Sequence, residues 1–270
     1  MGKTNNPDLK HIIVKHFDSY AANWDQRLKH HCYMTRFRTV KAMLPKIIND
    51  VADLGCGTGD YSALFDGSVN YIGIDNSEEM INRARGLYHG RKFIVGDVDG
   101  LDIPENSKDC VLAIGLFEYL EDPSILAGEI CRITKTNGKI ICSFPNKNNK
   151  LKNQISYFTK CIRLVQKVAH LFYKRDNGNQ NPLAPKGYVK DDRIVHRKYD
   201  EVLVLKLFNS GRFVHSQTKY ANFRVFSYFI GLSIMKRLDE ITSTFISVCG
   251  LDKLFSNYGS ILLMSFIKRP

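Results

Sequence analysis

The sequence predicts an α/β fold in which a parallel sheet carries helices on both faces. Two observations predict it. Between residues 50 and 146, short apolar runs typical of strands alternate with amphipathic runs typical of helices. A glycine-rich turn, "DLGCGTGD", directly follows the first of these strands. Because parallel strands need long crossover connections, the alternation favours a parallel sheet over a series of hairpins.

Strands are expected where short apolar runs are bounded by turn residues. In chain order these runs are residues 50–54, 70–75, 92–97, 109–115, 137–145, the β-rich stretch 212–228, and 259–268. The fifth strand is expected to be entered through the turn-forming pair Asn137-Gly138.

Helices are expected where apolar residues recur every three or four positions. In chain order these segments are residues 8–28, 33–47, a helix beginning at 61–65, then 77–88, 123–134 and 199–211. Pro45 is expected to end the second helix, and Ser77 to cap the amino end of the fourth.

Four segments follow from this pattern. They are an N-terminal helical lid (1–49), the core of the alternating fold (50–146), a helical insertion after the fifth strand (147–198), and a C-terminal segment (199–270) that completes the sheet with a helical excursion. The first and second halves of the chain differ in net charge. Residues 1–150 hold 19 basic and 19 acidic residues, whereas residues 151–270 hold 20 and 8 and therefore carry the whole net charge of +12.

The insertion combines a basic face with an apolar stripe. Residues 147–175 include eight basic side chains and no acidic one, and apolar residues recur at helical spacing from Leu151 to Phe172. Three interpretations remain open: a lid packed on the core, a helix 151–175 lying on anionic membrane, or a surface for nucleic acid. The aromatic residues lie on the apolar stripe, which favours core or lipid over base stacking.

Several classes of protein are not supported. No apolar run reaches the ~18 to 20 residues that cross a bilayer, and no signal peptide is evident. The seven cysteines form no CxxC pair, and the histidines show no ligand spacing. We therefore expect a cytoplasmic protein, with contact to a membrane surface as an open option, and no metal site.

The glycine loop argues against a phosphate-bearing ligand. A dinucleotide site has the spacing G-x-G-x-x-G, which would require glycine at position 60, and the chain has Asp60 there. A carboxylate at the start of a helix repels a pyrophosphate. Asp75 and Asp97, which end the second and third strands, are placed to accept hydrogen bonds from a ribose and from the amine of an adenine. A ligand with adenine, ribose and a zwitterionic tail fits this pattern.

These motifs resemble those of the class I S-adenosylmethionine-dependent methyltransferases, and among them the ubiquinone/menaquinone-biosynthesis-like (methyltransferase type 11) group. The resemblance rests on "VADLGCGTGDYS", "YIGIDNSEEMINRAR", "FIVGDVDGLDIPENSKDCVLAIGLFEYLEDP" and "EICRITKTNGKIICSFPN", and it covers roughly residues 11–146. It implies a Rossmann-like sheet of seven strands, mostly parallel with the last strand antiparallel, and S-adenosyl-L-methionine as the cofactor.

The resemblance also implies which residues contact the cofactor. Asp53 and the main chain of Gly55, Cys56 and Gly57 would hold the methionine end, with Gly59 in the same turn. Further contacts would come from Asp75 at the ribose, Asn76 and Met80 beside the adenine, Asp97 and Val98 at the adenine edge, and Gly115 and Leu116 along the methionine portion. Phe17, Tyr20 and Trp24 would belong to a helix that covers the cofactor.

No catalytic residue is predicted. Many relatives carry histidine after the fourth strand, whereas this chain has Glu118 and Tyr119. Tyr20, Tyr119, Tyr157 and His196 are weak candidates for a base, which is needed only if the acceptor arrives protonated.

The expected function is methyl transfer to a small-molecule or lipid-linked acceptor, with oxygen favoured as the methylated atom. The alternatives are an RNA methyltransferase that uses the basic C-terminal half, or a cofactor- or lipid-binding protein of the same fold without catalysis.

Overall fold

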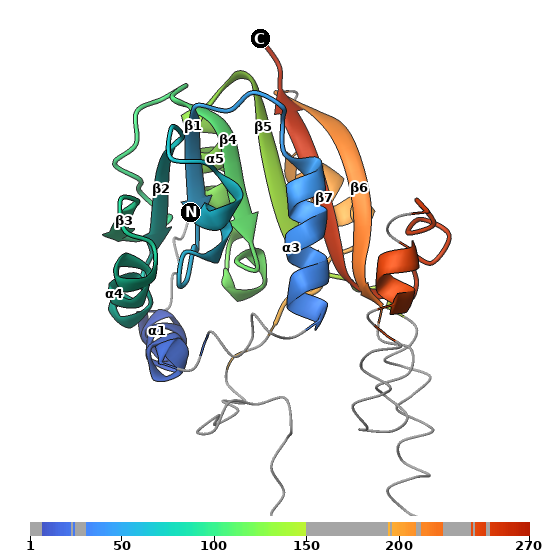
Figure 1. Cartoon of the computed structure of the whole chain (residues 1–270), viewed down its shortest axis with the longest axis horizontal. Helices are drawn as coiled ribbons and strands as arrows, with labels where there is room; N and C mark the ends of the chain where they lie inside the picture. The colour runs from blue at the N-terminus through green and yellow to red at the C-terminus, as the bar shows by residue number, and fades with distance from the viewer. Residues whose placement is uncertain are drawn as a thin grey trace, which may run out of the picture.

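The computed structural model describes residues 7–22, 24, 31–149, 194, 196–208, 212–223, 239, 241–246 and 249–270. Within them, seven strands form one twisted sheet with helices on both faces (Figure 1). The strands are β1 (Asp50–Leu54), β2 (Asn70–Asp75), β3 (Lys92–Val95), β4 (Lys108–Ile114), β5 (Thr134–Pro145), β6 (Phe213–Phe223) and β7 (Gly259–Lys268).

The strand order is β3-β2-β1-β4-β5-β7-β6. Strand β7 runs antiparallel to both of its neighbours, β5 and β6, and every other pairing is parallel. The predicted fold class and the antiparallel last strand are therefore confirmed. The order reverses between β1 and β4, and open α/β sheets bind their ligands beyond the carboxyl ends of the strands at such a reversal.

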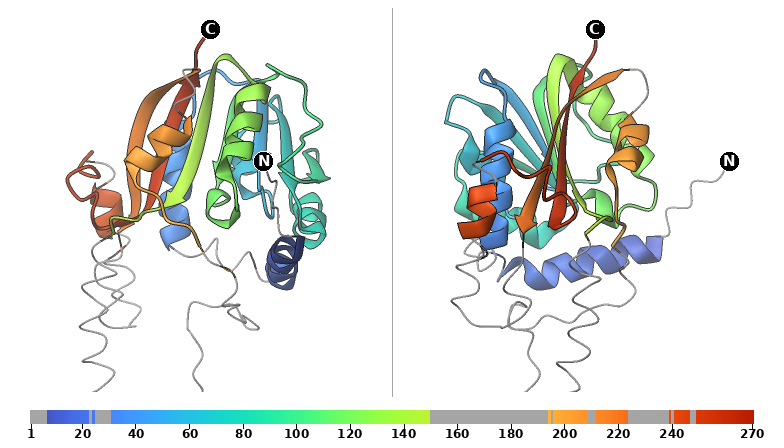
Figure 2. Two further views of the ribbon diagram at one scale, coloured as in Figure 1. Left: turned by 180° about the vertical axis from the view of Figure 1, so that it is seen from behind. Right: turned by 90° about the vertical axis from the view of Figure 1, so that its right-hand side faces the viewer.

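Two apolar cores lie on opposite faces of the sheet. Helices α5 (Pro123–Ile133) and α7 (Glu201–Phe208) cover one face, with Leu126, Ile130 and Val204 fully buried. Helices α3 (His31–Met43) and α4 (Glu78–Leu87) and the 3₁₀ helix η1 (Asp60–Leu64) cover the other face. Figure 2 shows α5 and α7 together on the rear face. Because both faces are covered, the parallel strands are apolar on both sides.

Helix α1 (Pro7–Ala21) lies apart from both layers, across the edge of the sheet at which the parallel strands end (Figures 1 and 2). Tyr20 and Ala21 of α1 pack on Met80 of α4. Helix α3 instead buries Val40 and Met43 against the sheet. The N-terminal segment therefore contains one helix at the edge of the sheet and one on its face.

Helix boundaries follow local signals. Helix α3 ends at Met43, two residues before Pro45. The Ser77 hydroxyl caps α4 by accepting a hydrogen bond from the Met80 amide at 3.2 Å. The segment expected to begin a helix after the glycine loop forms the single short 3₁₀ helix η1. Among the helices that the structure describes, none has the length and apolar character needed to cross a membrane.

The expected start of β5 is wrong by three residues. The strand begins at Thr134, directly after α5, and Asn137 and Gly138 lie inside it. Asn137 has a φ of +64°, and the pairing of β5 with β4 shifts register there. From Thr134 to Lys139 β5 advances five residues while β4 advances two, from Lys108 to Cys110. The Asn-Gly pair therefore lies in an irregular stretch within the strand instead of in a turn before it.

The chain leaves the sheet after β5 and returns to the same place. The Tyr199 amide donates to the Pro145 carbonyl at 2.9 Å, and the Lys147 amide donates to the Tyr199 carbonyl at 2.8 Å. Asn146 and Tyr199 form a parallel bridge. Most of the predicted insertion, including the whole of 151–175, lies outside the described residues.

Candidate active site

A cavity of about 210 Å³ lies between α1 and the carboxyl ends of β1, β2 and β4. The loops that follow these strands and β3 line it, together with residues of α1 and α3. Most of the residues predicted to contact a cofactor line this cavity, namely Gly55, Cys56, Gly57, Asp75, Asn76, Met80, Asp97, Val98, Gly115, Leu116 and Trp24.

The glycine loop presents its main chain to the cavity. The Gly55 and Cys56 amides both donate to the Ile74 carbonyl, at 2.8 and 3.0 Å, so the loop is tied to β2. Gly57 has a φ of +53°, and among the described residues a Cβ added there would meet one atom within 4 Å, the indole Nε1 of Trp24 at 4.0 Å. The Gly57 backbone therefore faces open space with Trp24 at its border, as close approach of a ligand requires.

Asp75 joins this loop to α4. One carboxylate oxygen accepts from the Gly57 amide at 2.8 Å and the other from the Ser77 amide at 3.0 Å. The Ser77 hydroxyl donates to Asp18 of α1 at 2.5 Å. Burial raises the pKa of Asp75. An ionised carboxylate has about four acceptor positions, so two amides leave capacity for the hydroxyls of a ribose.

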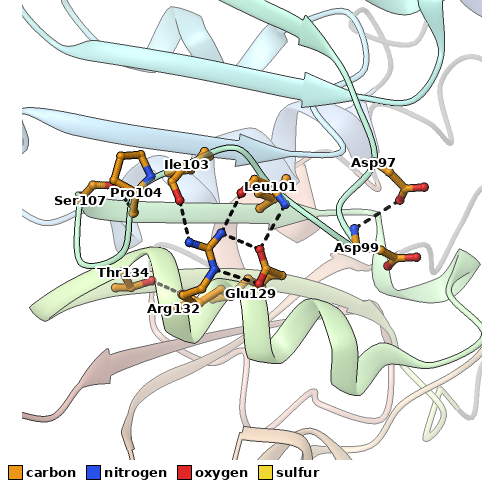
Figure 3. Close-up of polar contacts among 10 residues, drawn as sticks. Asp97, Asp99, Leu101, Ile103, Pro104, Ser107, Glu129, Arg132 and Thr134 are labelled. Atoms are coloured by element: carbon orange, nitrogen blue, oxygen red, sulfur yellow. Dashed lines mark hydrogen bonds and ion pairs between the residues drawn. The ribbon is translucent and has the colours of Figure 1, made fainter. Parts of the chain in front are cut away.

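A salt-bridged clamp holds the loop after β3 (Figure 3). The Arg132 guanidinium donates to the carbonyls of Leu101 and Ile103, at 2.8 and 2.7 Å. It also pairs with Glu129 at 2.7 Å, and Glu129 accepts from the Leu101 amide at 3.2 Å. The clamp fixes the residues that follow Asp97 and so positions the Asp97 carboxylate at the cavity.

Lys10 of α1 forms ion pairs with Asp97 and Asp99 across the cavity. Sequence reasoning missed this residue, because an exposed-looking lysine on an amphipathic helix carries no local signal. The contact ties the covering helix to the carboxylate that was predicted to read an adenine amine. An adenine bound at Asp97 would share that carboxylate with Lys10.

Three of the predicted residues do not line the cavity. The Asp53 side chain is 1% exposed and accepts a hydrogen bond from the Tyr71 hydroxyl at 2.6 Å. Tyr20 is buried between α1 and α4, and Gly59 packs against Phe93. The structure gives all three a place in packing, and direct contact with a cofactor stays a prediction for them.

Burial raises the pKa of Asp53 to about 7, which makes the stability of the protein depend on pH. An aspartate that titrates near 4 when unfolded binds more protons in the folded state between pH 4 and pH 7. The free energy of unfolding therefore falls as pH rises through that interval. Asp53→Asn keeps an acceptor for Tyr71 and removes the titration, so we expect it to be more stable than wild type at pH 8, by roughly 1 to 4 kcal/mol.

Urea denaturation at pH 5 and pH 8 measures this effect. Asp109→Asn is the matched control, because hydrogen bonds from Lys135 and from two amides lower the pKa of Asp109. That variant should lose stability at pH 8 instead of gaining it. A loss at pH 8 in Asp53→Asn as well would contradict the prediction.

Residues 52–142 match the family model described as a methyltransferase domain. These residues form a domain of the class I S-adenosylmethionine-dependent methyltransferases. It shares 27% identity over 206 residues with an uncharacterized protein of Methanocaldococcus jannaschii (MJ1123), an alignment that covers 73% of this chain and 95% of that protein. It shares 26% identity over 147 residues with 2-methyl-6-phytyl-1,4-hydroquinone methyltransferase of Synechocystis, covering 52% of this chain and 46% of that enzyme. The match therefore spans about half the length of that named enzyme.

Solved structures share the fold of this methyltransferase. A protein solved in complex with the Trm112 methyltransferase activator of Haloferax volcanii superimposes with a TM-score of 0.61 and 19% identity, covering 94% of this chain and 98% of that one. Magnesium protoporphyrin IX methyltransferase of Synechocystis, solved with bound SAH, gives a TM-score of 0.56 and 16% identity, covering 97% and 100% of the two chains. At such identity the likeness shows the fold alone.

The residues of the methyltransferase cavity suit S-adenosylmethionine, which supplies a methyl group already activated by a sulfonium. The open backbone at Gly57 and the spare acceptor capacity of Asp75 fit an uncharged ribose and an amino acid tail. Asp60, which would oppose a phosphate, is buried and accepts hydrogen bonds from Tyr33 and Thr58 at 3.0 Å each. A carboxylate so placed favours a ligand without phosphate.

A second group of polar side chains comes from α3 and η2 (Phe117–Tyr119). Tyr33 and Arg36 of α3 line the methyltransferase cavity, as do Glu118 and Tyr119 of η2. Sequence reasoning missed Tyr33 and Arg36. Their spacing of three places them on one helical face, but no local pattern shows that this face points into the site.

The four weak candidates for a base have different outcomes. Tyr119 lines the cavity, where its ring contacts those of Phe17 and His196, with centroids 5.1 and 5.0 Å apart. Tyr20 and His196 do not line it, and Tyr157 lies outside the described residues. In the part of the chain that the structure describes, no cluster of side chains could hold a metal ion.

Proposed function

We propose that this methyltransferase methylates a small-molecule or lipid-linked acceptor, with oxygen favoured as the methylated atom. The observation that carries the proposal is the position of α1 over the cavity. Leu9, Ile13 and Phe17 of this helix line the cavity opposite the strand ends. An acceptor that reaches the strand ends beneath a helix must be small, or must present a narrow reactive end.

Relatives of the chain support a small acceptor. One is named 2-methyl-6-phytyl-1,4-hydroquinone methyltransferase and another trans-aconitate 2-methyltransferase. The acceptors in these names bear hydroxyl or carboxyl groups. The polar side chains from α3 and η2 would pair with such groups, which supports oxygen as the methylated atom.

We further propose that the predicted residues at the cavity hold the cofactor. Gly57 would approach the methionine end with its main chain, Asp75 would accept from the ribose, and Asp97 would accept from the adenine. Trp24 would close over the bound cofactor and exclude water from the reaction.

Incorporation of label tests the proposal. Labelled S-adenosylmethionine is incubated with the protein and an extract of its source cells, and the extract is then separated into organic-soluble, aqueous small-molecule and macromolecular fractions. Label in the organic or small-molecule fraction supports the proposal. Label in nuclease-sensitive macromolecules overturns it in favour of an RNA acceptor, and the absence of label from every fraction would oppose catalysis.

A further inference from the structure

Arg36 and Glu118 meet at the carboxyl end of β4. Gly115 follows this strand with a φ of +75°, and its amide donates to the Ser143 hydroxyl at 2.8 Å. A Cβ added to Gly115 would lie 3.4 Å from Nη1 of Arg36 and 3.7 Å from Oε1 of Glu118. The two side chains therefore border the same small space, beside the residues proposed to flank the methionine end of the cofactor.

The main chain around Glu118 is held on the side away from the cavity. The Glu118 carbonyl accepts from the Arg197 amide at 3.1 Å, and the neighbouring Phe117 carbonyl accepts from the Tyr199 hydroxyl at 3.0 Å. The Phe117 ring is fully buried and contacts the ring of Phe144, with centroids 4.8 Å apart. Glu118 therefore projects from a rigid support, as a group that acts on a substrate requires.

The Glu118 carboxyl is buried with one oxygen open. The residue is 8% exposed, and Oε2 has no hydrogen-bond partner among the described residues. A buried polar atom without a partner is costly, and it invites a donor from a bound molecule. The Arg36 Nε is likewise buried and has no hydrogen-bond partner among the described residues. An open donor and an open acceptor therefore belong to the two side chains that border Gly115.

The surroundings of Glu118 include influences that favour its ionised form and influences that favour its protonated form. Burial favours the protonated form of the carboxyl, whereas a hydrogen bond from the Glu118 amide and the positive charge of Arg36 from α3 favour the ionised form. Tyr33 and Tyr61 interact with Arg36 in turn, and the charge of Glu118 raises the pKa of the nearby Tyr199. Burial prevails, and it raises the pKa of Glu118 to about 7. A carboxyl with this pKa both takes up and releases a proton near neutral pH.

We propose that Glu118 is the general base of the methyl transfer, that Arg36 stabilises the anion formed, and that the acceptor is a molecule whose nucleophile is a protonated hydroxyl, such as a phenol or an enol. The inference rests on the proposed function and names the chemical class of its acceptor.

In the proposed step the acceptor loses a proton as it gains the methyl group. Glu118 Oε2 takes the hydroxyl proton, and the Arg36 guanidinium stabilises the charge that grows on the acceptor oxygen. That oxygen uses an electron pair to form a bond to the methyl carbon of S-adenosylmethionine, while the carbon–sulfur bond breaks and its electrons remain on sulfur. The products are the methyl ether and the neutral thioether, and Glu118 then releases the proton to water.

Rates of label transfer test the proposal. Wild type, Glu118→Gln and the exposed-site control Glu105→Gln are compared between pH 6 and pH 8, using the extract fraction that accepts label. We expect Glu105→Gln to behave as wild type, whose rate at pH 6 is about one tenth of its plateau because the base must be ionised. Glu118→Gln should be about 10²- to 10⁴-fold slower and independent of pH. A wild-type rate, or an unchanged pH profile, would overturn the proposal.

A second measurement needs no acceptor. Burial raises the pKa of Asp53 to about 7 as well, so infrared difference spectra are recorded in Asp53→Asn protein. This protein should show the carbonyl band of a protonated carboxyl that disappears as pH rises through about 7, and Asp53→Asn/Glu118→Gln should lack it. When Arg36→Met is added to Asp53→Asn the band should persist to higher pH, while added Arg36→Lys should leave it unchanged. Absence of a titrating band in folded Asp53→Asn protein would refute the assignment. If this band titrates but no fraction accepts label, the proposed function is wrong, while the titration of Glu118 near neutral pH is still supported.

Discussion

Asp75→Ala is expected to weaken the binding of S-adenosylmethionine by roughly 10- to 150-fold. Hydrogen bonds to a charged group contribute about 1.5 to 3 kcal/mol each, and 1.4 kcal/mol is a factor of ten in affinity. The substitution removes the proposed acceptor for the ribose. It also removes the acceptor for the Gly57 amide, so the loop that approaches the cofactor loses its link to α4.

Isothermal titration calorimetry measures this loss. Asp66→Ala is the matched control, because the Asp66 carboxylate also accepts from the amide two residues ahead, that of Ser68 at 2.9 Å, but it lies away from the cavity. The control should bind the cofactor as wild type does. Asp75→Asn, which keeps one acceptor oxygen, should bind with intermediate affinity. An unchanged affinity in Asp75→Ala would show that the ribose does not bind to this carboxylate.

Gly59→Ala is expected to destabilise the protein by roughly 2 to 5 kcal/mol. Gly59 has a φ of +78°, and a left-handed conformation costs a residue with a Cβ about 1 to 2 kcal/mol. The added carbon would also lie 2.6 Å from the ring of Phe93 and 3.3 Å from Ala84. Overpacking of this kind costs about 1 to 3 kcal/mol, and Phe93 is buried in β3 and cannot move away freely.

Urea denaturation of Gly59→Ala and Gly86→Ala separates this effect from a general response to alanine. Gly86 lies in α4, where an added Cβ meets nothing within 4 Å. That variant should gain up to about 1 kcal/mol, because alanine favours the helix. The double variant Gly59→Ala/Phe93→Leu, in which leucine replaces the aromatic ring, should recover part of the lost stability. Equal stability of Gly59→Ala and wild type would show that the loop relaxes without strain.

Local signals predicted the strands, the capped helix α4 and most of the cavity. The chain turns at the end of each strand, so residues such as Asp75 and Gly115 are placed by the strand that precedes them. Contacts between distant segments could not be predicted in this way. The proximity of Arg36 to Glu118 depends on how α3 is oriented on the sheet, and the ion pair of Lys10 with Asp97 depends on how α1 crosses its edge.

The irregular stretch in β5 shows another limit of local reasoning. An Asn-Gly pair favours positive φ, and Asn137 does adopt it. The pair alone does not distinguish a turn between elements from extra residues within a strand. The pairing of Lys108 with Thr134, which extends β5 backward beyond the pair, decides between the two.

The bridge between Asn146 and Tyr199 means that the segment between them can change in length or sequence without separating its two ends. Its two ends are hydrogen-bonded side by side at the carboxyl end of β5. The pairing of the strands therefore does not depend on the length of chain that connects these ends. Doubling the length of such a loop costs only about 0.6 kcal/mol of closure entropy. This junction lies on the same edge of the sheet as the cavity. Exchange of the segment between the two ends is therefore expected to leave the residues that line the cavity unchanged.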